Sequence, residues 1–376
     1  VSISMLTGQN GILNRAAEAK EKTEQAQQEE SDKTTMMEAM IQTAGTSIAN
    51  QSSYGENPNA QATADGAGKY FALPTGAKYI EGTVDTGVVV NIKGSEFVWV
   101  PVEDVVLDES RVNELPTSSE NGTVSGKKTY TPMAVKIGND YKGLLYDFDG
   151  SNSWLMYGDN EKYQGGILEC REPSEVTYDI GEYKTEGISE ELLTTEYNLM
   201  IVSVSRYKGF YVARYEAGID KTTGKVVFKD ASISENNVIT TNAGRDENKM
   251  WYGLYKKMKM FSTDDEKIFS CMIWGSQYDA MMNWMTKNGK MVGNADDTKT
   301  NNDENRVTGI NKTDIINNVF DLYGCHYEWT LEAYSQSCRT LRGGFYGEIV
   351  SPAHRNNDLS NVTSTCHSSR ATILIK

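Results

Sequence analysis

The sequence contains 376 residues, with 37 basic and 52 acidic side chains, a formal net charge of -15 and a pI near 4.8. This acidic balance argues against nucleic-acid binding, because phosphate recognition requires a basic surface, and it suits a soluble surface protein. Mean hydropathy is -0.53 and no run of about 18 apolar residues occurs, so the sequence predicts no membrane-spanning helix. Its length allows one large core, or one domain with an appendage.

The 5 cysteines are too few to predict a disulfide framework in a chain of this length, and none belongs to a C-x-x-C pair. Cys325 could pair with Cys338, or Cys338 with Cys366. The sequence leaves both pairings open.

Residues 1–50 predict a helical stalk, because strong helix formers dominate the segment AAEAKEKTEQAQQEESDKTTMMEAMIQTA. Its second half has an apolar face made by Met36, Met37, Met40 and Ile41. The opening VSISMLTGQNGILNRAAEAKEKTEQA resembles the segment just after the hydrophobic N-terminal helix of clostridial type IV pilin-like proteins. This resemblance implies membrane insertion, or packing into a pilus, through a preceding apolar helix. The alternative is a plain helical stalk.

Residues 51–69 predict a linker, because Gly, Ser, Asn and Ala dominate there without periodicity. The globular domain is expected to span residues 70–376. Within it, residues 105–195 are polar and turn-rich, and they predict an insertion on the core with one strand at Gly143–Phe148.

Val88–Ile92 and Glu96–Pro101 predict two strands joined across a tight turn. Glu190–Ser205 predicts a helix, and Tyr207–Gly218 predicts a strand that follows it. One face of the helix collects its apolar side chains: Leu192, Leu193, Tyr197, Met200, Ile201 and Val204.

Alternation along the strand places Arg214 and Glu216 on one face and predicts a partly buried ion pair between them. Gly224–Phe228 predicts a further short strand, and the chain from there to Asp246 is expected to be loop.

Two more helices are predicted at Lys249–Phe261 and Gln277–Lys287 from apolar residues at helical spacing. Ser270–Asp279 is interpreted as the lead-in to the second of them. Cys271 is expected to be a small buried apolar residue. The Gly-, Asn- and Asp-rich segment Asn288–Asn311 predicts a loop.

Four segments, EFVWVP, GFYVARYEAG, NVFDLYGCHYEWT and RTLRGG, together with the closing strand ILI, resemble the formylglycine-generating-enzyme-like branch of the C-type lectin fold. The resemblance implies an α+β domain of that type over residues 70–376, carried on the pilin-like stalk.

Composition sets the last part of the chain apart. The 35 residues Cys338–Thr372 contain no Lys, Gln, Met or Trp and only Glu348, although about eight residues of these five types are expected. Codons that end in a pyrimidine cannot encode any of the five. This pattern resembles the lectin-fold variable proteins of diversity-generating retroelements, which implies a variable region over residues 320–372. An ordinary polar loop is the alternative.

Catalysis is not expected. Formylglycine-generating enzymes hold copper with a cysteine pair after the R-G-G motif, and Phe345–Ala353 contains no cysteine. The dipeptides Cys325–His326 and Cys366–His367 suggest thiol or metal chemistry, but neighbouring strand residues point to opposite faces and do not converge. The resemblance places calcium ligands around this turn; Glu328 keeps one of them, whereas Cys325 replaces an Asn whose oxygen a calcium ion would prefer. We therefore assign no catalytic residue, no metal site and no cofactor, and the sequence leaves open whether calcium is bound.

The sequence thus predicts a non-catalytic protein on the cell surface, associated with a pilus, that binds an unknown protein or glycan through a diversified face. The alternative is a lectin of fixed specificity or a minor pilin subunit acting as an adhesin. Other pilin subunits are possible partners through the N-terminal helix. Framework positions fixed by packing are expected at Trp329, Arg342, Gly343, Gly344 and Arg370. Positions expected to face the ligand resemble an antibody paratope in composition: His326, Tyr327, Phe345, Tyr346, Ile349, Val350, His354, Asn356, Asn357, Asp358, Asn361 and His367. Of these, Ile349 and Val350 could instead belong to the core.

Overall fold

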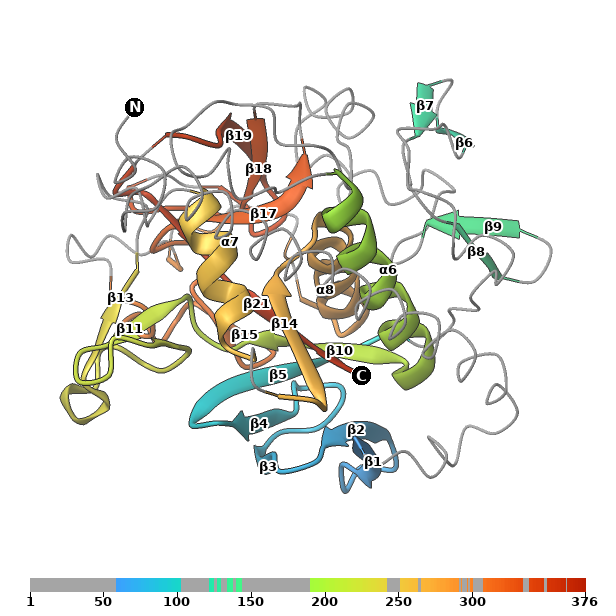
Figure 1. Ribbon diagram of the computed structural model, residues 1–376, viewed down its shortest axis with the longest axis horizontal. Coiled ribbons are helices and arrows are strands. Elements are labelled where there is room, and N and C mark those ends of the chain that lie inside the picture. The colour runs from blue at the N-terminus through green and yellow to red at the C-terminus, as the bar shows by residue number, and fades with distance from the viewer. Residues whose placement is uncertain are drawn as a thin grey trace, which may run out of the picture.

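A six-stranded antiparallel sheet runs through the centre of the protein, in the order β14-β21-β10-β5-β4-β3 (Figure 1). The computed structural model describes residues 59–102 and 190–376, apart from 242–250, 263–264, 291, 293–295, 297, 300–306, 334–337, 348–349 and 363, together with four short strands between 122 and 143. The six strands are β14 (Ile268–Met272), β21 (Ala371–Ile375), β10 (Gly209–Ala213), β5 (Ser95–Pro101), β4 (Val89–Ile92) and β3 (Lys78–Glu81). Together with helices between them, this gives an α+β architecture.

The predicted hairpin before residue 102 is confirmed. Strands β4 and β5 pair up to Ile92 opposite Ser95, which leaves a two-residue turn. Both turn residues have positive φ, 52° at Lys93 and 81° at Gly94. That combination matches the right-handed twist of the strands it connects.

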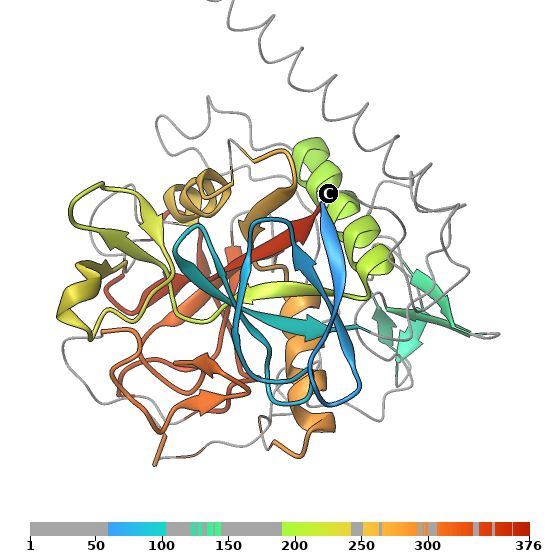
Figure 2. The ribbon, with the colours of Figure 1, turned by 90° about the horizontal axis from the view of Figure 1, so that it is seen from below.

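The closing strand β21 is the second from one edge of the sheet and ends at the C-terminus (Figure 2). Every residue of β21 is buried, and β10 is likewise buried along its whole length. Both strands are covered on two faces, which explains why they are mostly apolar rather than alternating. The hydroxyl of Ser203, on helix α6 (Glu190–Tyr207), bonds both the amide and the carbonyl of Ile375. This contact fixes the helix against the end of the chain.

The three predicted helices are present as α6, α7 (Trp251–Met260) and α8 (Gly275–Lys287). The buried side chains of α6 include Leu193, Met200 and Val204, as the apolar face predicts. Glu196 is also buried and accepts hydrogen bonds from Tyr255 on α7 at 2.9 and 3.0 Å. The two helices are therefore joined by a buried polar contact that periodicity does not reveal.

Two expectations about strands are wrong. The chain between Gly218 and Thr240 was expected to hold one strand, yet β11 (Gly218–Asp220), β12 (Val226–Val227) and β13 (Val238–Thr240) form a three-stranded sheet. Such short strands are too brief to show alternation. The first residues of the segment interpreted as a helix lead-in, Ser270–Met272, belong to strand β14, which pairs with β21, whereas Gly275–Asp279 begin helix α8.

A third difference concerns the predicted linker, residues 51–69. Strand β1 (Ala60–Ala64) lies within it and pairs with β2 (Tyr70–Pro74). Small Ala and Thr side chains dominate β1, so its composition resembles that of a linker.

Arg214 does not pair with Glu216, contrary to the prediction. Strand β10 ends at Ala213, so strict alternation stops before these residues. The guanidinium instead contacts Glu96 and Glu81, each at 2.8 Å. Glu216 instead contacts His326.

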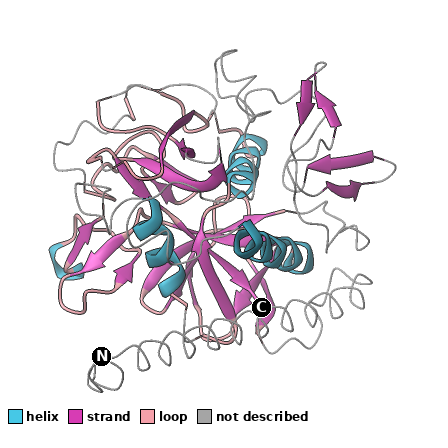
Figure 3. Cartoon of the chain, turned by 45° about the horizontal axis from the view of Figure 1, so that its top comes forward, coloured by secondary structure: helices cyan, strands magenta, loops and turns pink. Residues whose placement is uncertain are grey.

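Strands β6 (Gly122–Val124), β7 (Lys127–Thr129), β8 (Ala134–Ile137) and β9 (Asp140–Gly143) form two hairpins set apart from the other strands (Figure 3). They lie inside the predicted insertion, whereas residues 144–148 of the strand expected there are outside the described part. The predicted stalk, residues 1–50, is also outside it. No helix among the described residues combines the length and apolarity that a membrane crossing demands.

Cys271, Cys325, Cys338 and Cys366 form no disulfide in the part of the chain that the structure describes. Neither open disulfide pairing is therefore formed here. Cys271 is fully buried, as expected of a small apolar residue, and burial raises its pKa to about 12.

Candidate functional site

A second sheet, in the order β19-β18-β17-β20, carries five of the twelve predicted binding residues, and we call it the C-terminal sheet. Figure 1 shows β17–β19 at the end of the molecule opposite β1–β3. Strand β18 lies antiparallel between β17 and β19, whereas β17 and β20 run parallel. The parallel pairing places Tyr327 opposite His367, two positions predicted to face a ligand. The strands are β17 (Tyr327–Ala333), β18 (Cys338–Arg342), β19 (Arg355–Leu359) and β20 (His367–Ser369).

Four predicted residues form one aromatic cluster: Tyr327, Phe345, His354 and His367. The Tyr327 ring lies at the centre, with centroids 4.7 Å from Phe345, 6.1 Å from His354 and 6.3 Å from His367. Beneath it, Trp329 meets the His367 ring edge to face at 5.0 Å. Residues far apart in the sequence thus pack together: the pairing of β17 with β20 brings Tyr327 beside His367, and the chain between β18 and β19 supplies Phe345 and His354.

Most of the aromatic cluster is less exposed than predicted. Tyr327 is 3% exposed, His354 9% and His367 5%, while Phe345 is half-buried. Ring-on-ring packing removes these side chains from water, since stacked aromatic groups cover one another. Tyr327, His354 and His367 are therefore packed inside rather than freely exposed, and we refer to the aromatic cluster as the floor.

The polar rim around this floor comes mainly from β19. Asn356 and Asp358 are half-buried, and strand alternation places both side chains on the same face of β19. The Asp358 carboxylate lies 3.9 Å from Nε2 of His367. Asn357 is exposed but alternates to the other face, so it does not share this surface. Tyr346, Val350 and Asn361 are half-buried, and Ile349 lies outside the described residues.

His367 is held in its neutral form. Burial is the larger cause, and the nearby charge of His326 adds to it; together they lower the pKa of His367 to about 4. The Asp358 carboxylate acts in the opposite direction, but its side chain is 36% exposed and water weakens its influence. Burial also raises the pKa of Asp358 above its usual range. At neutral pH the floor therefore carries no positive charge from His367.

The framework residues are buried, as predicted. Arg370 is fully buried and bonds Glu328 through Nε at 2.9 Å and again through Nη2. It also donates to the carbonyl oxygens of Ala213 and Phe320, each at 2.8 Å. One side chain thereby joins the central sheet, the turn before β17 and the C-terminal sheet.

Arg342 makes a second buried anchor. Its guanidinium bonds Asp279 of helix α8 at 2.8 Å and lies over the ring of Tyr278 at 4.5 Å. A buried cation stacked on an aromatic face and paired with a carboxylate is strongly held. Helix α8 is thus fixed beneath β18.

The glycine pair after β18 is required by space. A Cβ on Gly344 would overlap the carbonyl oxygen of Tyr323, and Gly343 has a φ of +73°. Only glycine fits both demands without moving the backbone. The R-G-G segment is therefore a backbone requirement of the framework.

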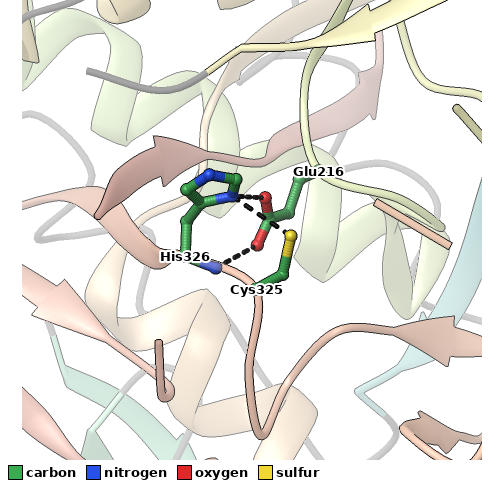
Figure 4. A group of neighbouring side chains, drawn as sticks. All are labelled: Glu216, Cys325 and His326. Carbon is green, nitrogen blue, oxygen red and sulfur yellow. Dashed lines mark hydrogen bonds and ion pairs between the residues drawn. The ribbon is translucent and has the colours of Figure 1, made fainter. Parts of the chain in front are cut away.

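His326 differs most from its predicted position. It is fully buried, and its Nδ1 lies 2.6 Å from Oε2 of Glu216 and 3.2 Å from Sγ of Cys325 (Figure 4). The backbone amide of His326 also donates to Oε1 of Glu216 at 3.1 Å. This residue therefore does not face an external ligand.

The prediction that Cys325 and His326 diverge is also wrong. It assumed strand alternation, but β17 begins only at Tyr327, and Cys325 has a φ of +69°. The left-handed backbone turns the thiol toward the imidazole. Glu216, which the sequence paired with Arg214, completes this group, and no sequence signal linked it to a turn so far along the chain.

The geometry of this group does not match a thiol–imidazole–carboxylate relay. Such a relay uses one imidazole nitrogen for the nucleophile and the other for the acid. Here the thiol of Cys325 and the carboxylate of Glu216 both contact Nδ1 of His326. Burial also raises the pKa values of the Glu216 carboxyl and the Cys325 thiol, which disfavours a reactive thiolate.

Two buried carboxylates that the sequence interpretation overlooked shape the turn before β17. Asp314 accepts the amides of Leu322 at 3.2 Å and Tyr323 at 2.9 Å. Asp321 accepts a hydrogen bond from the hydroxyl of Thr308 at 2.7 Å, and burial raises the pKa of Asp321 to about 7.

Comparisons with family models, with curated proteins and with solved structures found no match for this chain.

Proposed function

We propose that this protein binds an external protein or glycan ligand, without catalysis, through the surface formed by the aromatic cluster and the rim of β19. The observation that carries the proposal is that Tyr327, Phe345, His354 and His367, selected from the sequence alone, meet in one cluster. Asp358 joins them through its contact with His367. A hydrophobic floor with a few polar groups at its edge is typical of recognition surfaces.

The framework beneath this surface supports the same proposal. Arg342, Gly344 and Arg370 are all buried and tied to neighbouring elements, while the rim residues Asn356 and Asp358 stay partly exposed. A rigid scaffold that carries variable side chains is the arrangement by which loops and strand edges recognise diverse partners. We take the domain to be of the formylglycine-generating-enzyme-like lectin type on the strength of its sequence segments.

Display of this surface outside the cell is part of the proposal. Its support is the likeness of residues 1–30 to pilin-like proteins and the acidic balance of the chain. In this proposal the stalk joins a pilus or membrane, and other pilin subunits are its partners there. Nucleic acid is not an expected ligand, because the net charge is -15.

Sequencing the encoding locus in sibling strains tests whether the surface is diversified. The expected result is variation confined to the rim and cluster positions, next to a reverse transcriptase and a near-copy template. Framework codons such as those of Arg342, Gly344 and Arg370 should stay constant. Identical sequences in all strains would instead favour a lectin or minor pilin of fixed specificity.

Binding is tested directly with protein and glycan arrays probed by the purified chain. A variant with Asn356→Ala and Asp358→Ala should lose the signal and keep its thermal unfolding midpoint. The matched control carries Asn357→Ala, which lies on the other face of β19. If the double variant retains the binding that the array detects, the proposed surface is wrong.

A further inference from the structure

Three side chains of different chemistry meet in the interior between strand β10 and the turn before β17. The donor atoms of Glu216, Cys325 and His326 all lie within 4.8 Å of one another, and all three residues are fully buried. A carboxylate, a thiolate and an imidazole are ligands that zinc accepts together. Calcium and magnesium prefer oxygen alone, so sulfur and nitrogen in this set disfavour them.

The surroundings of the group hold more carboxyl groups than cationic side chains. The carboxyl groups of Glu216, Asp321 and Glu328 are buried, and Arg370 is bonded to only one of them, Glu328. Among the described residues, Oε2 of Glu328 and Oδ1 of Asp321 are buried without a hydrogen-bond partner. Buried anionic oxygens are costly unless a proton or a cation compensates them.

We propose that Glu216, Cys325 and His326 bind one divalent transition-metal ion of the zinc class. The ion joins the chain just after β10 to the turn that leads into Tyr327, and so positions the start of β17. Three protein ligands leave one place in a tetrahedral shell for water or for a further carboxylate oxygen. This inference does not depend on the proposed ligand-binding function.

One of the two separations between donor atoms is close to what the ion requires, and the other must lengthen when the ion binds. With bonds of about 2.3 Å to sulfur and about 2.0 Å to nitrogen or oxygen, tetrahedral angles place donors roughly 3.3 to 3.5 Å apart. The distance from Sγ of Cys325 to Nδ1 of His326 is 3.2 Å, and that from Nδ1 to Oε2 of Glu216 is 2.6 Å. The second distance is a hydrogen-bond length, so the ion must displace the proton between these atoms. Release of protons by bound metal is the general rule for such ligands.

The test uses the full chain, purified from cells grown with added zinc and without chelator, with metal content measured by mass spectrometry. Wild-type protein should hold about one zinc ion per chain. Unfolded protein is then refolded with Co(II) in place of zinc, because a buried site fills during folding. A thiolate-to-cobalt charge-transfer band should appear in the near ultraviolet.

Controls separate this site from other thiols. Cys325→Ser and Glu216→Gln should lose most of the zinc and the charge-transfer band. Cys366→Ser is the matched control, because Cys366 also precedes a histidine, and it should keep both. If refolded wild-type protein shows no band and purifies without metal, the group is a hydrogen-bonded cluster only and the proposal fails. It also fails if Cys366→Ser, rather than Cys325→Ser, removes the band.

Discussion

Arg370→Met is expected to be among the most damaging single changes in this protein. Methionine keeps much of the aliphatic volume but removes every donor, so the loss is electrostatic rather than steric. Glu328 then remains buried without its partner, and the carbonyl oxygens of Ala213 and Phe320 lose their donors. Breaking a buried ion pair by removing one partner costs about 3 to 5 kcal/mol. Each carbonyl left unsatisfied adds about 1 to 3 kcal/mol before relaxation.

The structure therefore supports a loss of at least about 4 kcal/mol in the free energy of unfolding, which is a large fraction of the roughly 5 to 15 kcal/mol typical of a domain. Urea unfolding followed by tryptophan fluorescence measures it. The double variant Arg370→Met with Glu328→Gln should recover about 1 to 3 kcal/mol, because the buried carboxylate is then also removed. A loss below about 1 kcal/mol for Arg370→Met, or a double variant no more stable than the single one, would refute this reasoning.

Three smaller predictions concern the same sheet. Gly344→Ala should lower the free energy of unfolding by about 3 kcal/mol, because its Cβ would overlap the carbonyl of Tyr323. The control Gly347→Ala should cost only about 1 to 2 kcal/mol, because that position has open space but a φ of +81°. Equal losses for the two variants in urea titrations would argue against the overlap. The lowered pKa of His367, about 4 against 6.5 when unfolded, means that the unfolded chain binds more protons between these values. Stability should rise with pH across that window by up to about 3 kcal/mol, and His367→Asn should remove this part of the slope in unfolding measured at several pH values; an unchanged slope would contradict it. Asn357→Ala should change stability by less than about 0.5 kcal/mol by the same assay, since its side chain is exposed, and a larger loss would mean that it makes a contact in the folded protein.

Hydrophobic patterns predicted the helices and strands whose apolar residues repeat within one short segment. The β4–β5 hairpin was predictable because two apolar runs flank Lys93 and Gly94, and helix α6 because its apolar residues recur at helical spacing. Strand β14 was missed because periodicity cannot tell a five-residue run from part of a helix, and its residues were interpreted as a helix lead-in. Its pairing with β21 joins segments that are distant in the sequence, and neither segment shows that pairing by itself.

The candidate site shows the same limit. Composition and resemblance selected Tyr327 and His367, and the parallel pairing of β17 with β20 brings them together. What the sequence did not reveal is their burial, because ring packing between distant strands is a tertiary property. His326 was assigned to the surface because it belongs to the C-terminal segment of unusual composition, whereas it is fully buried against Glu216. The φ of +69° at Cys325 brings its thiol into the same buried group.

The floor side chains are tightly packed and the rim side chains are not, so amino-acid substitutions are tolerated better at the rim. Tyr327 packs against three other rings, so replacing it alone would leave a cavity, and cavities from lost aromatic side chains cost about 3 to 5 kcal/mol. Asn356 and Asp358 lie on a strand at the edge of the sheet and are only half-buried, so most replacements there change little packing. If this surface is diversified, the rim residues should vary independently, whereas Tyr327, His354 and His367 should vary only in combinations that preserve their summed volume.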